Sequence, residues 1–194
     1  QAARQVRARG AMALPAAAEI VAFWREVGHA AWFAKDDAFD AALRTRFEAA
    51  HHAAARGELS HWAQDWQGAL ALLLLIDQFP RNLFRGSAHA FATDGLALHL
   101  ARQAIAAGLD RQAPMDLRVF FYLPLEHSEA LADQEDCVGL CEALDAEGGD
   151  WTPWARMHRD IIARFGRFPH RNAMLGRAMT DEEQAYIDEG GFTG

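Results

Sequence analysis

Apolar residues recur along most of this chain with the spacing of α-helices. From Ile20 to Val27, apolar side chains fall at positions i, i+3, i+4 and i+7, which places them on one stripe of a helix. Phe39, Leu43 and Phe47 recur every four residues in the segment that follows. No run of four or more residues alternates apolar and polar side chains with enrichment in β-branched residues. The pattern therefore predicts an all-α fold.

Capping and helix-breaking residues set the predicted helix boundaries. Asp36 is expected to cap the helix that carries Phe39, and Gly57 stands where that helix should stop. The other predicted helices begin at or near Ser60, residue 88, Pro114, Ser128, Thr152–Pro153 and the capping box Thr180–Glu183. The sequence thus predicts a single domain of about eight or nine helices over residues 17–194, with antiparallel neighbours because the connections are short. Residues 1–16 are expected to form a flexible tail.

The length of the apolar runs and the spacing of the cysteines indicate the cellular location of the protein. The longest uninterrupted apolar run, Ala69–Ile76, is far shorter than the roughly 20 residues needed to span a bilayer. The basic N-terminal segment lacks an apolar core of signal-peptide length. Cys137 and Cys141 lie four residues apart and share a helix face, which is typical of two small buried thiols rather than of a disulfide framework or a zinc site. These features predict a cytoplasmic protein without a membrane partner.

Charge is acidic overall and unevenly distributed. The net charge of −8 argues against non-specific nucleic-acid binding, which needs a basic face. Residues 126–150 contain nine acidic side chains and no Lys or Arg, whereas residues 151–177 contain six Arg and one Asp. Most of these arginines are expected to pair with a neighbouring acidic helix, which stabilises little per exposed pair.

One phrase occurs twice in the chain. Residues 77–84 read "DQFPRNLF" and residues 164–172 read "RFGRFPHRN". Because proline disfavours helical geometry in the residue before it, we expect helices to end near Phe79 and near Phe168. Asn82 and Asn172 would then cap the next helices. In a functional interpretation, the free N–H groups there, with Arg81, Arg171 and His170 beside them, would bind an anion.

A third polar phrase follows another proline. In "YLPLEHSEAL", residues 122–131, His127 is flanked by Glu126 and Glu129 and could act as a general base with a carboxylate partner. Ser128 is predicted to be an N-cap rather than a nucleophile. Because no HExxH, HxxxH or CxxC spacing is present, we predict neither a metal nor another cofactor.

Five motifs in order resemble a known family. They are "WFAKDDAFDAALRTRF" (32–47), "LLLIDQFPRNLFRG" (73–86), "AFATDGLALHLARQAI" (90–105), "FFYLPLEHSEALADQ" (120–134) and "HRDIIARFGRFPHRNAMLGR" (158–177). Together they resemble the bacterial DUF924 family from about residue 20 to residue 192. The resemblance implies a tetratricopeptide-like antiparallel helical array and no established activity. The family's characteristic polar positions fall on Asp77, Gln78, Arg81, Asn82, Glu126, His127, Ser128, Glu129, Arg164, Arg167, His170, Arg171 and Asn172.

The sequence leaves three functional hypotheses. The first is binding of a small anionic ligand or an acidic peptide, and the second is a small-molecule enzyme of hydrolase or transferase type. The third is a set of structural Arg–carboxylate braces without a ligand. The residues assigned to ligand binding are Arg81, Asn82, Arg167, Arg171, Asn172, Asp77, Gln78 and Glu129, and those assigned to acid–base catalysis are His127, Glu126 and His170. The positions of the two repeated phrases in space are needed to distinguish these three hypotheses.

Overall fold

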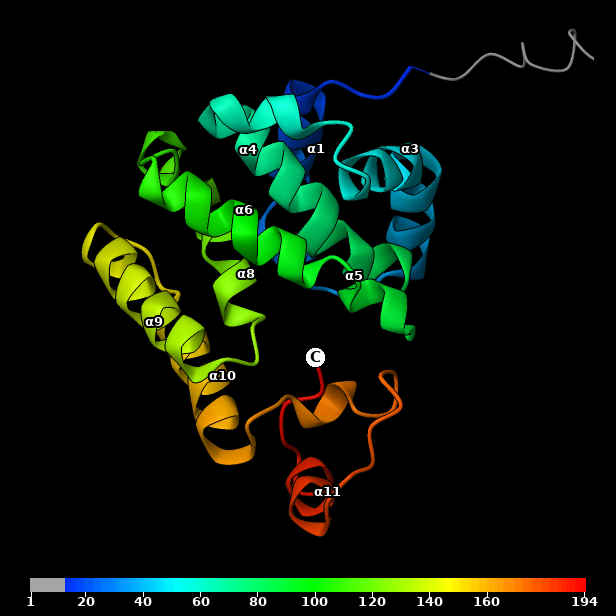
Figure 1. Cartoon of the computed structure of the whole chain (residues 1–194), viewed down its shortest axis with the longest axis vertical. Helices are drawn as coiled ribbons and strands as arrows, with labels where there is room; N and C mark the ends of the chain where they lie inside the picture. The colour runs from blue at the N-terminus through cyan, green and yellow to red at the C-terminus, as the bar shows by residue number, and fades with distance from the viewer. Residues whose placement is uncertain (1–12) are drawn as a thin grey trace, which may run out of the picture.

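The computed structural model describes residues 13–194 as a bundle of helices and short loops (Figure 1). Residues 1–12, on which most of the predicted flexible tail falls, lie outside the described residues. The α-helices are α1 (Ala17–Val27), α2 (His29–Trp32), α3 (Asp37–Ala55), α4 (Trp66–Leu73), α5 (Phe79–Leu83), α6 (Asp94–Ala106), α7 (Met115–Arg118), α8 (Leu123–Glu126), α9 (Leu131–Ala146), α10 (Thr152–Phe165) and α11 (Asp181–Asp188). No strand occurs between residues 13 and 194, so the predicted all-α fold class is confirmed.

The main hydrophobic core forms around α4, which crosses the middle of the bundle between α1 and α6 (Figure 1). Almost every residue from Ala69 to Pro80 is buried, because helices pack on all sides of this stretch. Phe79 packs against Trp24 and Phe47, with ring centroids 5.4 and 5.1 Å away. A helix that is apolar on all sides is stable only when it is buried, so the most apolar run of the sequence forms the central helix.

Two further parts complete the fold. The helices α9 and α10 lie side by side as an antiparallel pair (Figure 1), and they share the most extensive helix contact of the described structure. After α10 the chain passes through a short 3₁₀ turn (Pro169–Arg171) to α11. A small separate apolar cluster around Ile161, Ile162 and Phe168 holds this C-terminal part.

The first repeated phrase does not end a helix, contrary to prediction. The chain continues from α4 through a π-helical turn, Leu74–Gln78, directly into α5. The Phe79 N–H donates to the Leu74 carbonyl, five residues back, and Pro80 has no N–H to offer to Leu75. The wider π turn accommodates the proline within a continuous helical path. Asn82 therefore lies inside α5 and caps no helix.

A helix does end at the second phrase, but a glycine ends it rather than the predicted Phe168-Pro169 step. The helix α10 ends at Phe165, and Gly166 follows in the left-handed conformation with a φ of 69°. The predicted cap Asn172 is not followed by an α-helix until Asp181. Its side chain instead contacts Arg177 and Glu183.

Other capping predictions gave mixed results. Asp36 accepts hydrogen bonds from the Ala38 and Phe39 N–H groups, and the capping box at Thr180 is formed, as predicted. The prediction was wrong for Ser60, where a 3₁₀ turn precedes α4 and Asp65 caps it. It was also wrong for Ser128, whereas α10 begins at Thr152, as predicted, but without a side-chain cap from that residue. The helix α9 begins after Ala130, and the Trp151 and Thr152 N–H groups at the start of α10 donate to Asp145 of α9.

The remaining predictions on thiols and membranes can be compared directly with the structure. Cys137 and Cys141 are buried and free. Within residues 13–194, no helix is both long enough and apolar enough to cross a bilayer.

Candidate functional site

The two repeated phrases meet in space. Arg81, from α5, donates from both terminal nitrogens to the Asp94 carboxylate at 3.1 Å, and Arg171, from the 3₁₀ turn after α10, donates to the same carboxylate at 3.3 Å. Asp94 is the first residue of α6. Two guanidinium groups that are 90 residues apart in the chain thus share one acid.

Asp77 and His127 form a buried dyad beside these arginines. The π-helical turn places Asp77 at the end of the central helix path, and the loop after α8 places His127 opposite it. The His127 Nδ1 lies 2.8 Å from Asp77 Oδ1, and the Gln78 amide donates to Asp77 Oδ2 at 2.6 Å. The prediction that Glu126 or Glu129 is the carboxylate partner of His127 is therefore wrong. Neighbouring residues on a helical turn point in different directions, so the partner comes from another element.

The environment of the dyad favours an ionised Asp77 and a neutral His127. Burial opposes the charge of Asp77, but the charge of Arg81 and hydrogen bonds from His127 and Gln78 lower its pKa. Burial, and then the charge of Arg81, lowers the pKa of His127 below its usual range, although Asp77 acts in the opposite direction. The neutral imidazole therefore donates its Nδ1–H to Asp77, which leaves Nε2 as a free base.

Glu126 lies near the dyad and contacts α10. Its carboxylate lies 3.3 Å from His158 Nδ1, and the same ring nitrogen lies 2.9 Å from the Trp154 carbonyl. Burial, with a further contribution from Asp77, raises the pKa of Glu126 to about 8. Burial also lowers the pKa of His158 to about 4. At neutral pH this contact joins a protonated acid and a neutral imidazole.

His170 lies at the edge of the same group. Burial, followed by the charge of Arg171, lowers its pKa to about 3. Its Nδ1 is buried and has no hydrogen-bond partner among the described residues. The Phe192 ring packs edge-on against both His158 and His170, with centroids 4.7 and 5.1 Å away. The C-terminal residues thus cover this side of the group.

Arg171 uses few of its donors for a buried arginine, a feature that the half-buried Arg118 shares. Its guanidinium lies between the rings of Phe91 and Phe168, 4.7 and 4.6 Å from their centroids. Among residues 13–194, its only hydrogen bond goes to Asp94, and its buried Nε has no partner. Burial and the nearby charge of Arg81 lower its pKa to about 10.

Several residues assigned to the site from sequence lie in other networks. Asn82 donates to Asp40, which also accepts two hydrogen bonds from Arg85. Arg167 donates from two nitrogens to Glu183.

A third network lies between the 126–129 turn and the C-terminal part. Glu129 accepts from two nitrogens of Arg177 and from the Phe168 N–H, and Asn172 accepts from Arg177. Asn82, Arg167, Asn172 and Glu129 are therefore placed as braces at the border of the group rather than in it.

The structure also adds residues to which the sequence analysis gave no ligand-binding or acid–base role. They are Asp94, His158, Phe91 and Phe168. Asp94 at the start of a helix reads in sequence as an ordinary first-turn acid, and His158 lies on an amphipathic stripe where a core histidine is common. Asp94 differs from an ordinary first-turn acid only because a second arginine, Arg171, also reaches it. That contact is visible only in the tertiary structure.

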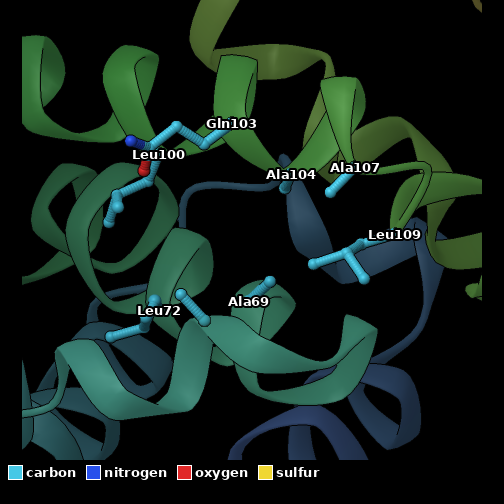
Figure 2. A pocket seen from close by; sticks show the side chains of 8 residues that line it. Ala69, Leu72, Leu100, Gln103, Ala104, Ala107 and Leu109 are labelled. Atoms are coloured by element: carbon cyan, nitrogen blue, oxygen red, sulfur yellow. The ribbon is translucent and has the colours of Figure 1, made fainter.

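The two clearest cavities lie away from this group. Figure 2 shows one of about 200 Å³ between α4 and α6, lined mainly by small and aliphatic side chains such as Ala69, Leu72 and Leu109. A second, of about 330 Å³, is lined by residues that include Trp32 and Trp151. The residues described above, Asp77, Arg81, Asp94, Glu126, His127, His158, His170 and Arg171, are called the Asp77–Arg171 group. Neither cavity is lined by a residue of this group.

Comparison with other proteins gives a family and a relative. The sequence profile of bacterial proteins of unknown function designated DUF924 matches residues 20–191. The chain is also similar to a solved protein of unknown function, ATU0120 from Agrobacterium tumefaciens, with 52% sequence identity and a TM-score of 0.86. That similarity covers 90% of this chain and 97% of the other. No curated protein matches the chain.

Proposed function

Because this chain belongs to the DUF924 family, as its five motifs predicted, and both the family and its solved relative are of unknown function, we propose a function from the side chains themselves. The protein binds a small anionic ligand, a carboxylate or a phosphate, between Arg81 and Arg171. The observation that carries this proposal is the convergence of two guanidinium groups on Asp94, with Asp77 as a second carboxylate beside Arg81.

The use of donors is compatible with an anion at Arg171. An arginine offers five N–H donors in a fixed fork. Arg177 spends its donors on Glu129, Asn172 and the Phe168 carbonyl, as expected for a structural brace. Arg171 spends one on Asp94 and leaves a buried N–H without a partner among residues 13–194. An anion beside Arg171 would supply that partner and offset the cost of burying the charge.

Exposure limits the size of the ligand. The side chains of Arg81 and His127 are 22% and 14% exposed, and that of Arg171 is 8% exposed. Such a surface admits a carboxylate or phosphate group more readily than a long peptide. An acidic peptide bound along a tetratricopeptide-like concave face, and the cytoplasmic location, stay predictions.

A second candidate function is acid–base catalysis on such a ligand, and the Asp77–His127 dyad favours it. An imidazole held at Nδ1 by a buried carboxylate presents Nε2 as a general base. Glu126, with its pKa raised to about 8, stays protonated near neutral pH and would act as the acid. Of the residues predicted from sequence, His127 and Glu126 keep these roles. His170, at the edge of the group, would contact the ligand rather than transfer a proton.

Thermal unfolding in the presence of anions tests the binding proposal. We expect inorganic phosphate or small dicarboxylates to raise the melting temperature at pH 7, since a ligand at a hundredfold over its Kd adds about 2.7 kcal/mol of stability. Arg171→Ala and Arg171→Lys should both remove that rise, because lysine lacks the fork that binds two oxygens. Arg156→Ala is the matched control, since Arg156 pairs with Glu142 on the exposed surface.

The outcomes separate the hypotheses. Equal rises in the wild type and in both Arg171 variants would contradict the proposal. Lower stability of the Arg171 variants, with no anion raising the wild-type melting temperature, would establish Arg171 as a brace. For the second candidate, His127→Gln should keep the anion-induced rise and abolish turnover of a panel of phosphate and carboxylate esters.

A further inference from the structure

Three histidines from α3 and from the turn after α5 gather beside the π turn. His51 and His52 lie near the end of α3, and His89 lies in a 3₁₀ turn, Ala88–Phe91, that follows α5. One ring nitrogen from each lies within 4.8 Å of the other two. No acid–base or anion-binding role proposed above uses these residues.

His51 is held in the orientation and tautomer of a metal ligand. The side chain is fully buried, and its Nδ1–H donates to the Leu75 carbonyl at 2.8 Å. That carbonyl is free for His51 because Phe79 donates to Leu74 instead and Pro80 has no N–H. The remaining nitrogen, Nε2, is buried without a partner among the described residues. Metal-binding histidines commonly donate their second ring N–H to a carbonyl in this manner.

The other two histidines can approach His51 from the surface. Neither His52 nor His89 is buried. The His89 ring stacks on Phe84 with centroids 3.7 Å apart, and Phe84 also contacts the His51 ring at 5.4 Å. Phe84 thus forms an apolar floor beneath the three imidazoles and shields one side of the cluster from water.

A carboxylate stands beside the three rings. Glu48 lies one helical turn before His52, and its Oε1 is 3.9 Å from His52 Nε2. Residues four apart on a helix share a face, so both side chains can reach one ion. The cluster therefore offers three imidazole nitrogens, with a carboxylate oxygen beside that of His52.

We propose that His51, His52 and His89 bind a divalent transition-metal ion, with Zn²⁺ the best fit. Imidazole and carboxylate ligands in a tetrahedral set are typical of zinc. A zinc ion bound at about 2.05 Å places its ligand nitrogens about 3.3 Å apart. The histidine nitrogens are within 4.8 Å of one another, so rotation of the surface rings of His52 and His89 toward the fixed His51 would close the site.

A metal at this position would have a structural consequence. It would join the end of α3 to the turn after α5, across the point where the π turn widens the central helix path. Because the ion binds the folded arrangement and not the unfolded chain, its binding would stabilise the fold. The inference is independent of the anion site and does not require it.

Metal titration of chelator-treated protein tests the proposal. We expect one Zn²⁺ per chain by isothermal titration calorimetry and a higher melting temperature with Zn²⁺ than without it. His89→Gln and His52→Gln should each weaken binding more than about 100-fold, beyond the range seen for loss of an outer partner of a metal ligand. His61→Gln is the matched control, because His61 is an exposed histidine outside the cluster and should leave binding unchanged. His51→Gln is left out of the comparison because a buried change can unfold the protein by itself.

A spectroscopic measurement gives a second, direct readout. Co²⁺ in place of Zn²⁺ should produce the visible absorption of a tetrahedral site with nitrogen and oxygen ligands, and His89→Gln should abolish it. Zinc affinities that are equal in the wild type, His89→Gln and His61→Gln would overturn the proposal. Such a result would make the cluster a set of rings that merely stack on Phe84.

Discussion

At the scale of single residues, burial controls which groups of the site carry charge. Glu126 and His158 lie in contact, yet burial drives both toward their neutral forms, whereas Asp77 keeps its charge because Arg81 and His127 surround it. The sequence pointed to His127 and Glu126 as candidate acid–base residues, because both stand in a polar phrase after a proline. It could not predict that Asp77 would be the partner of His127, because that contact joins residues 50 positions apart.

Replacement of Glu126 gives a pH-dependent prediction. The folded-state pKa of Glu126 is raised to about 8 from its ordinary 4.5, so the folded protein holds a proton that the unfolded chain has released. The stabilisation from this proton is complete below pH 4.5 and is lost as the pH rises through 8. Relative to Glu126→Gln, the wild type should lose stability from pH 6.5 to 8 by up to about 1.4 kcal/mol per pH unit.

Urea unfolding of both proteins across this range measures the difference. The comparison cancels groups that titrate identically in the two proteins. The pKa values of His158 and His170 are lowered to about 4 and about 3, so these residues reduce stability only as the pH falls below 6.5. Parallel stability curves above pH 6.5 would show that Glu126 is ionised in the folded protein, which would also remove it as the proposed acid.

At the scale of helices, local sequence signals worked where no partner element competed. Asp36 and the Thr180 capping box behaved as the sequence predicted, since both act within their own turn. Pro80 did not end its helix because the buried run before it is packed on all sides and the π turn kept the path continuous. Similarly, the start of α10 is capped by Asp145 from the neighbouring helix, which no local motif reveals.

Two glycines in helices should respond oppositely to alanine. A Cβ on Gly68 of α4 would lie 2.0 Å from the Trp62 carbonyl oxygen, a backbone atom that cannot rotate away. Gly68→Ala should therefore destabilise the protein by at least about 1–3 kcal/mol. A Cβ on Gly139 of α9 meets nothing within 4 Å, so Gly139→Ala should stabilise it by about 1 kcal/mol. Chemical denaturation measures both, and a stabilising Gly68→Ala would contradict the close approach of the 3₁₀ turn (Ser60–Gln64) to α4.

At the scale of the whole molecule, polar networks join parts that have separate apolar clusters. The C-terminal part around Phe168 has its own small cluster, and the main core lies around α4. Arg177 connects this part to the 126–129 turn through Glu129, with both side chains about a quarter exposed. Of the arginines in 151–177, Arg156 pairs with Glu142 and Arg177 with Glu129 of the acidic stretch 126–150. Arg164 and Arg167 pair with Glu182 and Glu183 of α11 instead, so the predicted pairing with the neighbouring acidic stretch is wrong for most of these arginines.

Removal of Arg177 should loosen the C-terminal part alone. Arg177→Ala deletes charge-assisted hydrogen bonds to Glu129, so amide exchange in residues 167–188 should speed up roughly tenfold or more. Amides of α4 should keep their protection. Arg164→Ala is the control, because Arg164 pairs with Glu182 at an exposed surface and such pairs contribute less than about 1 kcal/mol. Equal acceleration in both variants, or acceleration that extends to α4, would contradict this division of the molecule.

By itself, the sequence determined the all-α class, most helix positions, the family and the polar phrases that hold the proposed site. These follow from periodicity, capping and motif order, which are local properties of the chain. Only the tertiary structure decided that Arg81 and Arg171 share Asp94, that Asp77 orients His127, and that His51, His52 and His89 converge. Those contacts join residues far apart in sequence, and their protonation depends on burial that no local pattern records.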